Sequence, residues 1–262
     1  MNLKLLHIFL LSTGGTLLLC TPLIHTTELV NGLVIGKMCW FHLVMLFFSV
    51  CVFFVVLTKR TTAIAFLSSD LLLLIFTGTV LITYKWSLNP EPEKLIFIGQ
   101  LVIFWFLLRY ILTAYREFNF FFLFVGILTG LVEAVWGMQQ LHGHAYSNHS
   151  LFRLTGSFFN PGPYSGYLAV VLPVGLWMAL RFQKGMRCFG YICVGAILIV
   201  LPAGMSRSAW MAAVVACGWV YWAERIGWEK TKAVYRRNKN ATIPFIAIVA
   251  ILVGCAIAEL YG

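Results

Sequence analysis

About nine apolar stretches, each close to the length of a bilayer-crossing helix, follow one another along this 262-residue chain. A helix needs about 20 mostly apolar residues to span the hydrocarbon. Of all residues, 61% are hydrophobic and 11% are charged, whereas soluble domains carry roughly 25% charged residues. The sequence therefore predicts an all-α, polytopic membrane protein whose main solvent is the lipid bilayer. The expected spans are residues 4–24, 37–57, 62–83, 95–115, 118–138, 164–181, 188–205, 208–223 and 243–260.

The distribution of Lys and Arg predicts how these spans are oriented. If the N-terminus lies in the cytoplasm, 14 of the 19 Lys and Arg residues fall on the cytoplasmic side and five on the other. Cytoplasmic loops of membrane proteins carry such an excess. We therefore expect a cytoplasmic N-terminus. We attribute the formal charge of +10 to membrane topology, and expect no nucleic-acid partner.

The chain shows no internal repeat and no linker, so we expect a single transmembrane domain over residues 1–262. Gly262 falls at the outer end of the ninth expected span, and we expect the domain to be incomplete at its C-terminus. The seven cysteines form no CxxC pair and lie in or beside apolar stretches, as packing residues do. We expect no metal ion and no cofactor.

Two arginines are expected on the outer side, where the topology bias disfavours them. Arg153 lies in the most polar outer stretch, Gln139–Pro163, and Arg207 lies in a short turn between the seventh and eighth spans. A guanidinium keeps its charge and binds two oxygens at once, so the pair suits a phosphate or diphosphate. Snorkelling of each side chain to lipid phosphates is the alternative.

The segment Asn160-Pro-Gly-Pro163 precedes the sixth expected span. Asn and Gly favour a turn, and Pro suits the first turn of a helix, where its missing N–H costs nothing. We therefore expect a turn that leads into a helix. Exposed N–H groups at such a helix start can also receive an anion.

Two motifs in this region resemble the O-antigen ligase and polymerase superfamily. The first reads Arg153-Leu-Thr-Gly-Ser-Phe-Phe-Asn-Pro161, and the second, Ser206-Arg-Ser208, follows it after an apolar span. The resemblance covers about residues 120 to 225. It implies a metal-independent glycosyl transfer at the periplasmic face of the bacterial inner membrane. The donor would be a glycan on an undecaprenyl-diphosphate carrier, and the acceptor a hydroxyl of lipid A-core or of another glycan.

The same resemblance implies roles for three residues. Arg153 and Arg207 would be catalytic, because they would hold the diphosphate and stabilise charge on the leaving group. Asn160 would contribute to substrate binding. The family's general base is a histidine in a large periplasmic loop that follows a span like the ninth. That loop would lie beyond Gly262, so we expect this chain to be catalytically incomplete on its own.

Three histidines of the outer stretch, His142, His144 and His149, are alternatives for a general base or for zinc ligands. No carboxylate accompanies them in that stretch. We favour a solvated loop over a metal site or a catalytic one.

Two carboxylates fall inside expected spans, Asp70 well within the third and Glu133 in the outer third of the fifth. Burying a charge in the bilayer is costly, so each is expected to pair with a polar group of a neighbouring helix. Arg109 and Arg116, near the cytoplasmic side, are expected to snorkel. Alternatively, the two carboxylates are the coupling residues of a transporter or flippase-like carrier, although the chain lacks an evident repeat of the kind carriers show. An inactive membrane remnant is a third alternative.

Overall fold

The computed structural model of the protein describes residues 3–26, 32–59, 66–87 and 92–227. Throughout these residues the regular structure is helical, with no strand, which confirms the predicted all-α class. The elements are α1 (Leu3–Leu19), η1 (Thr21–Leu23), α2 (Gly32–Thr58), α3 (Ser68–Lys85), α4 (Pro92–Ala114), α5 (Glu117–Leu141), α6 (Pro161–Arg181), α7 (Lys184–Val200), η2 (Pro202–Gly204), α8 (Arg207–Tyr221) and the π-helical turn η3 (Trp222–Ile226).

Six helices of the described residues are long and apolar enough to cross a membrane, namely α2 to α6 and α7 extended to Gly204. The protein is therefore a multi-pass membrane protein. Helix α1 is apolar but has 17 residues, and α8 has 15 and continues into η3. The ninth expected span, 243–260, lies outside the described residues, so the count of nine stays a prediction.

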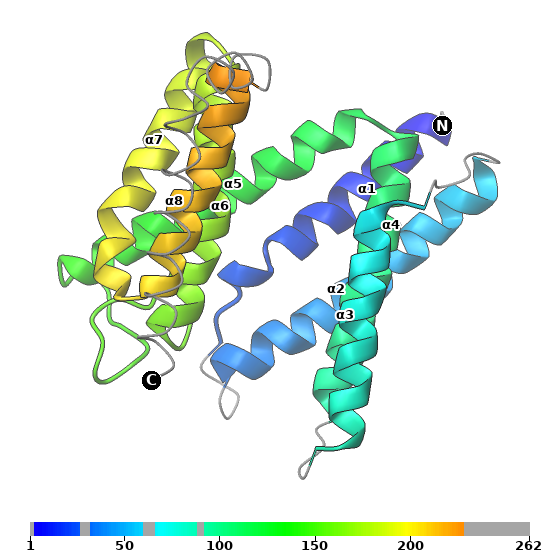
Figure 1. Ribbon diagram of the computed structural model, residues 1–262, viewed down its shortest axis with the longest axis horizontal. Helices are drawn as coiled ribbons and strands as arrows, with labels where there is room; N and C mark the ends of the chain where they lie inside the picture. Colours follow the sequence, from blue (N-terminus) through cyan, green and yellow to red (C-terminus); the bar gives the residue numbers. More distant parts are fainter. Residues whose placement is uncertain (1–2, 27–31, 60–65, 88–91, 228–262) are drawn as a thin grey trace, which may run out of the picture.

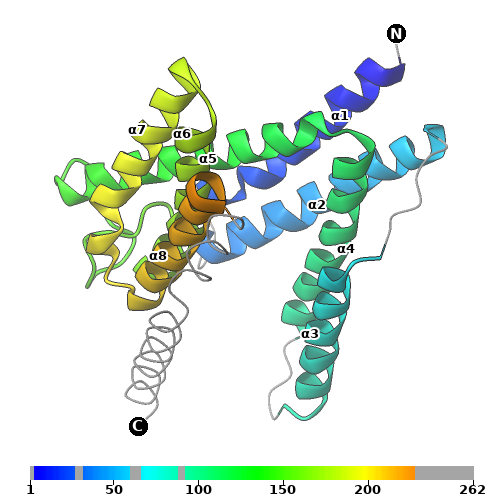
Figure 2. The same ribbon diagram turned by 45° about the horizontal axis from the view of Figure 1, so that its top comes forward.

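Consecutive helices run in alternate directions along the molecule (Figures 1 and 2). Toward the bottom of Figure 1, α1, α3, α5 and α7 end and α2, α4, α6 and α8 begin. We call this the motif end, because residues 142–160 and 201–206 lie there. The opposite end carries the turn that contains Arg116 and the α6–α7 turn, residues 182–183.

Two apolar cores share helix α5. The first core packs α1, α2 and α4 around side chains such as Phe48 and Ile111, and it includes Phe118 from the first turn of α5. The second core packs α5 to α8 around side chains such as Leu168 and Ile197. Helix α5 therefore contributes side chains to both cores and connects the two halves of the molecule.

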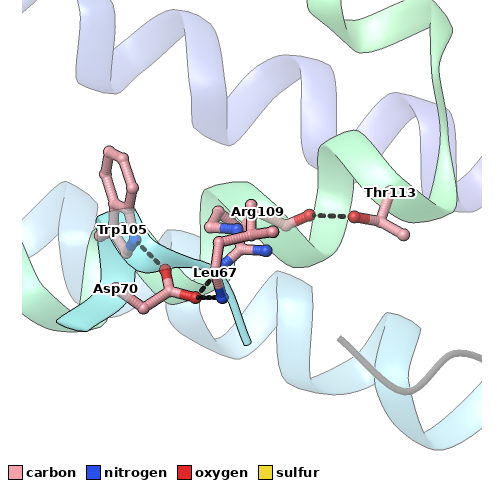
Figure 3. A network of polar contacts seen from close by, with 5 residues as sticks. All are labelled: Leu67, Asp70, Trp105, Arg109 and Thr113. Carbon is pink, nitrogen blue, oxygen red and sulfur yellow. Dashed lines mark hydrogen bonds and ion pairs between the residues drawn. The ribbon is translucent and has the colours of Figure 1, made fainter. Parts of the chain in front are cut away.

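The third span begins later than predicted, at Ser68, so Asp70 lies in the first turn of α3 and not well within the span. Asp70 accepts the N–H of Leu67 at 2.8 Å, which satisfies a donor that the helix start leaves unpaired. Figure 3 shows the same carboxylate accepting Trp105 Nε1–H at 2.8 Å and pairing with Arg109, both from α4. This confirms the expected partner on a neighbouring helix. Arg109 is engaged in this ion pair, a partner that the sequence did not assign to it, and its snorkelling stays a prediction.

Candidate functional site

The segment that contains the first motif is held against α5 by Gln140, a buried side chain near the end of that helix. Its side-chain oxygen accepts the backbone N–H groups of Thr155 at 2.9 Å and Gly156 at 2.7 Å. Its amide nitrogen donates to the carbonyls of Tyr146 and Gly156, both at 3.0 Å. Both donors and the acceptor of this amide are used. The motif segment is thus fixed in place although it belongs to no helix or strand.

Glu133, two turns earlier on α5 and fully buried, holds the next residue of the motif. One carboxylate oxygen accepts the backbone N–H of Ser157 at 3.0 Å, and the other accepts its hydroxyl at 2.5 Å. Lys37 of α2 donates to that hydroxyl at 3.0 Å, to the carbonyl of Ile24 at 2.6 Å and to the carbonyl of Pro22. The three ammonium hydrogens therefore meet three acceptors. This network joins the end of α1, the start of α2, α5 and the motif.

The structure explains why the first motif has a glycine at position 156. Gly156 has a φ of +55°, a backbone conformation that side chains with a Cβ rarely adopt. A Cβ at this position would lie 2.4 Å from the ring of Tyr164 and 2.5 Å from a carboxylate oxygen of Glu133. Tyr164, in α6, is fully buried and donates its hydroxyl to the carbonyl of Glu133 at 3.2 Å. Glycine alone meets both requirements.

The first motif ends where α6 begins. Asn160 is the N-cap residue, with an extended backbone, and its side-chain oxygen accepts the N–H of Gly162 at 3.0 Å. Pro161 follows as the first helical residue. This confirms the predicted turn and helix start. The helix begins before the predicted boundary at 164, because the cap precedes both prolines and both are accommodated in the first turn.

The second motif lies where α8 begins. Arg207 is the first residue of α8, and Ser206 precedes it as the N-cap residue. The turn that leads to it packs on the start of α6, because a Cβ on Gly204 would lie 2.0 Å from the hydroxyl of Ser165. The Ser206 side chain makes no capping hydrogen bond. The first N–H groups of α8 therefore receive no side-chain cap from this residue.

A groove of about 510 Å³ lies between the first turns of α6 and those of α8. On the α6 side its walls include Gly162, Gly166 and Pro173, and on the α8 side they include Ser206, Ala212 and Ala216. Small side chains on both walls leave the space open. The groove begins beside the two helix starts and runs along both helices.

Arg153 and Arg207 are both exposed, and both lie at the motif end. Arg207 stands between Ser206 and Ser208, which line the groove. Within the part of the chain that the structure describes, neither guanidinium makes a hydrogen bond or an ion pair. The structure thus brings Arg207 and Asn160 to adjacent helix starts. It places Arg153 at the same end of the molecule, without a contact to either.

The outer histidines form no metal site in the structure. The rings of His142 and His144 stack with their centroids 6.5 Å apart, and the His149 ring packs against Phe152 and Phe159. No three His, Cys, Asp or Glu side chains among residues 3–26, 32–59, 66–87 and 92–227 are grouped so that they could hold a metal ion. These contacts are those of aromatic packing in a loop.

Two residues that hold the motif, Gln140 and Lys37, were not singled out by the sequence analysis. Gln140 follows Glu133 by two helical turns and lies on the same face of an apolar helix, a periodicity that could have indicated it. Lys37 is a basic residue on the expected outer side, where Lys and Arg are disfavoured. Its unusual position could have indicated that it has a specific role.

No protein-family model matches the chain, and neither does any curated protein or solved structure.

Proposed function

We propose that the protein transfers a glycan from an undecaprenyl-diphosphate carrier to a hydroxyl acceptor, either lipid A-core or another glycan. The reaction takes place at the periplasmic face of the bacterial inner membrane. The N-terminus then lies in the cytoplasm, and the motif end lies in the periplasm. The apolar helices support a bilayer environment, which is where a lipid-linked donor resides. The likeness of the two motifs to the O-antigen ligase and polymerase superfamily supplies the reaction class.

The observation that carries the proposal is the meeting of the two motifs at one end of the molecule. The first motif ends in the cap of α6, and the second opens α8, and the two helix starts flank one groove. A helix start carries partial positive charge on its N–H groups and attracts phosphates. Arg207 adds a full positive charge there, and Arg153 adds a second at the same end. This combination suits a diphosphate at the level of the lipid headgroups.

In the proposed reaction, an acceptor hydroxyl oxygen forms a bond to the anomeric carbon of the donor sugar. The bond between that carbon and the diphosphate oxygen breaks, and the diphosphate leaves with its electron pair. Arg153 and Arg207 stabilise the negative charge that develops on it. The hydroxyl proton passes to a general base, which the family resemblance assigns to a histidine of a later periplasmic loop. The donor's phosphate ester supplies the driving force.

The test replaces each arginine by alanine in the full-length protein in its own cells. We expect Arg153→Ala and Arg207→Ala to lower transfer by about 100-fold or more, the usual effect of removing one charge-stabilising donor. The loaded lipid carrier should accumulate, while the amount of protein in the membrane stays unchanged. Lys85→Ala is the matched control, because Lys85 is an exposed cation at the motif end of α3 and lies outside the groove.

Normal transfer by both arginine variants would show the proposal to be wrong. The carrier alternative predicts the reverse pattern, with loss of function in Asp70→Asn and Glu133→Gln and little effect of the arginines. Both carboxylates already have fixed partners, Asp70 in α4 and Glu133 in the motif segment. These contacts support structural roles for the two side chains.

A further inference from the structure

We infer that the groove between α6 and α8 receives the polyprenyl chain of the lipid-linked donor, with the diphosphate at Arg207. This inference rests on the proposed function and adds to it the path of the lipid through the protein. It assigns a binding role to groove residues that belong to neither motif, Gly166 and Ala212 among them.

The groove has the form that a hydrocarbon chain requires. It extends on α6 from Gly162 to Pro173, a helix length of about 16 Å at 1.5 Å per residue. Glycine and alanine line most of both walls, so the chain can approach the helix backbones closely. Val170, which lines the groove on α6, is exposed, so the groove is open on that side. A lipid can therefore enter from the bilayer.

The charge distribution along the groove matches an amphiphile with an anionic head. Its polar end is lined by Ser206 and Ser208, the neighbours of Arg207 in the sequence. It lies at the start of α8, where the Ser206 side chain makes no capping hydrogen bond. The remainder, as far as Pro173 and Ala216, is apolar. A diphosphate at the polar end would leave its prenyl chain directed along the apolar part.

Two other cavities of the described residues are also apolar but lack an available cation. One, of about 310 Å³, lies on α6, α7 and α8 and is lined by side chains such as Leu198 and Trp210. The other, of about 480 Å³, lies between α1, α2, α5 and α6 and includes Lys37. The ammonium hydrogens of Lys37 are already donated to Pro22, Ile24 and Ser157. Of these three cavities, the groove between α6 and α8 is the one that has an exposed arginine, Arg207, between two of its lining residues.

The test replaces small residues that line the groove by leucine, so that the new side chains fill it. A Cβ on Gly166 would meet nothing within 4 Å, so the first atom of a leucine side chain is accommodated and Gly166→Leu adds bulk to the groove. Gly195, in α7, has the same open surroundings outside the groove, and Gly195→Leu is the matched control. Ala212→Leu fills the groove from the α8 wall and serves as the second variant if Gly166→Leu does not accumulate.

The probe is a polyprenyl diphosphate with a diazirine in its chain, photocrosslinked to the purified full-length protein. We expect labelled peptides from α6 and α8, and about 10-fold weaker binding by Gly166→Leu or Ala212→Leu. This corresponds to the loss of about two buried CH₂ groups. Gly195→Leu should bind like the unmodified protein. Labelling confined to other helices, or undiminished binding by both filled variants, would overturn the inference.

A transfer assay on the same variants separates this inference from the proposed function. Loss of transfer in Arg207→Ala together with normal transfer in both filled variants would refute the lipid path and leave the reaction standing. Normal transfer in both Arg153→Ala and Arg207→Ala would refute the reaction itself. Loss of transfer in the filled variants, with Gly195→Leu unaffected, would support both.

Discussion

At the scale of single residues, Gly156 shows how one position of a short motif can meet both a backbone requirement and a packing requirement. Its backbone must turn with a positive φ, and its missing side chain leaves room for Tyr164 and Glu133. Tyr164 and Glu133 are themselves fully buried, so neither can move aside. One glycine therefore lets the motif segment lie directly on α5 and α6.

We expect Gly156→Ala to destabilise the protein by about 2–5 kcal/mol, from the cost of a left-handed backbone and of overpacking. Gly143→Ala is the control, because Gly143 also has a positive φ, +77°, but a Cβ there would meet nothing within 4 Å. Gly143→Ala should lose only the part of the stability that comes from the left-handed backbone. Thermal unfolding of the purified variants in detergent measures the difference. Equal losses of stability in the two variants would mean that the contact with Tyr164 does not matter.

At the scale of elements, α3 and α4 form a hairpin whose polar contacts lie close to one end. The outer faces of both helices are apolar and exposed, with side chains such as Leu72 and Ile103 turned to the surroundings. Asp70 is the one buried residue of α3. The contacts of its carboxylate with Trp105 and Arg109 therefore set how the hairpin closes.

A double-mutant cycle at Asp70 and Arg109 tests whether their contact stabilises the α3–α4 hairpin. We expect Asp70→Leu and Arg109→Leu each to lower the unfolding temperature, because each breaks the ion pair and leaves one of its two charges in a largely buried site. The double variant should be more stable than either single variant, since replacing both partners leaves neither charge unpaired. Thermal unfolding in detergent is again the measurement. Strictly additive losses would mean that the two side chains are not coupled.

The positions of the helices could be predicted from the sequence because each apolar run approaches the length that hydrocarbon requires. The start of α6 was missed by three residues, since the boundary depends on the Asn160 cap and not on hydropathy. The four hydrogen bonds of Gln140 could not be predicted. They join residues brought together only when the loop folds back on α5, and no local pattern records such a contact. Asp70 was expected to have a partner, but its identity followed from the α3–α4 geometry.

At the scale of the whole molecule, the alternation of helices predicts which residues share a side of the membrane. Residues at the motif end, such as Tyr146, should all lie on one side, and residues beside the α6–α7 turn, such as Gly185 in the first turn of α7, on the other (Figures 1 and 2). In the proposed orientation, with a cytoplasmic N-terminus, the motif end is periplasmic.

Cysteine labelling tests this orientation in a variant whose seven native cysteines are replaced by alanine. Tyr146 is 97% exposed, so a membrane-impermeant maleimide should label Tyr146→Cys in spheroplasts. Gly185→Cys, in open surroundings, should be labelled only after the membrane is permeabilised. The reverse pattern would place the motif end in the cytoplasm and would rule out a periplasmic reaction.

The contacts of Lys37 also set an order of events during synthesis. Its partners Pro22 and Ile24 precede it in the chain, but Ser157 follows it by 120 residues. At about 5–20 residues per second, a ribosome needs roughly 6–24 seconds to reach that serine. For most of this interval α1 and α2 are already made, and the lysine has only the two earlier carbonyls as partners from this network. Closure of the network on the nascent chain must therefore wait until α5 has been inserted and the motif segment has emerged.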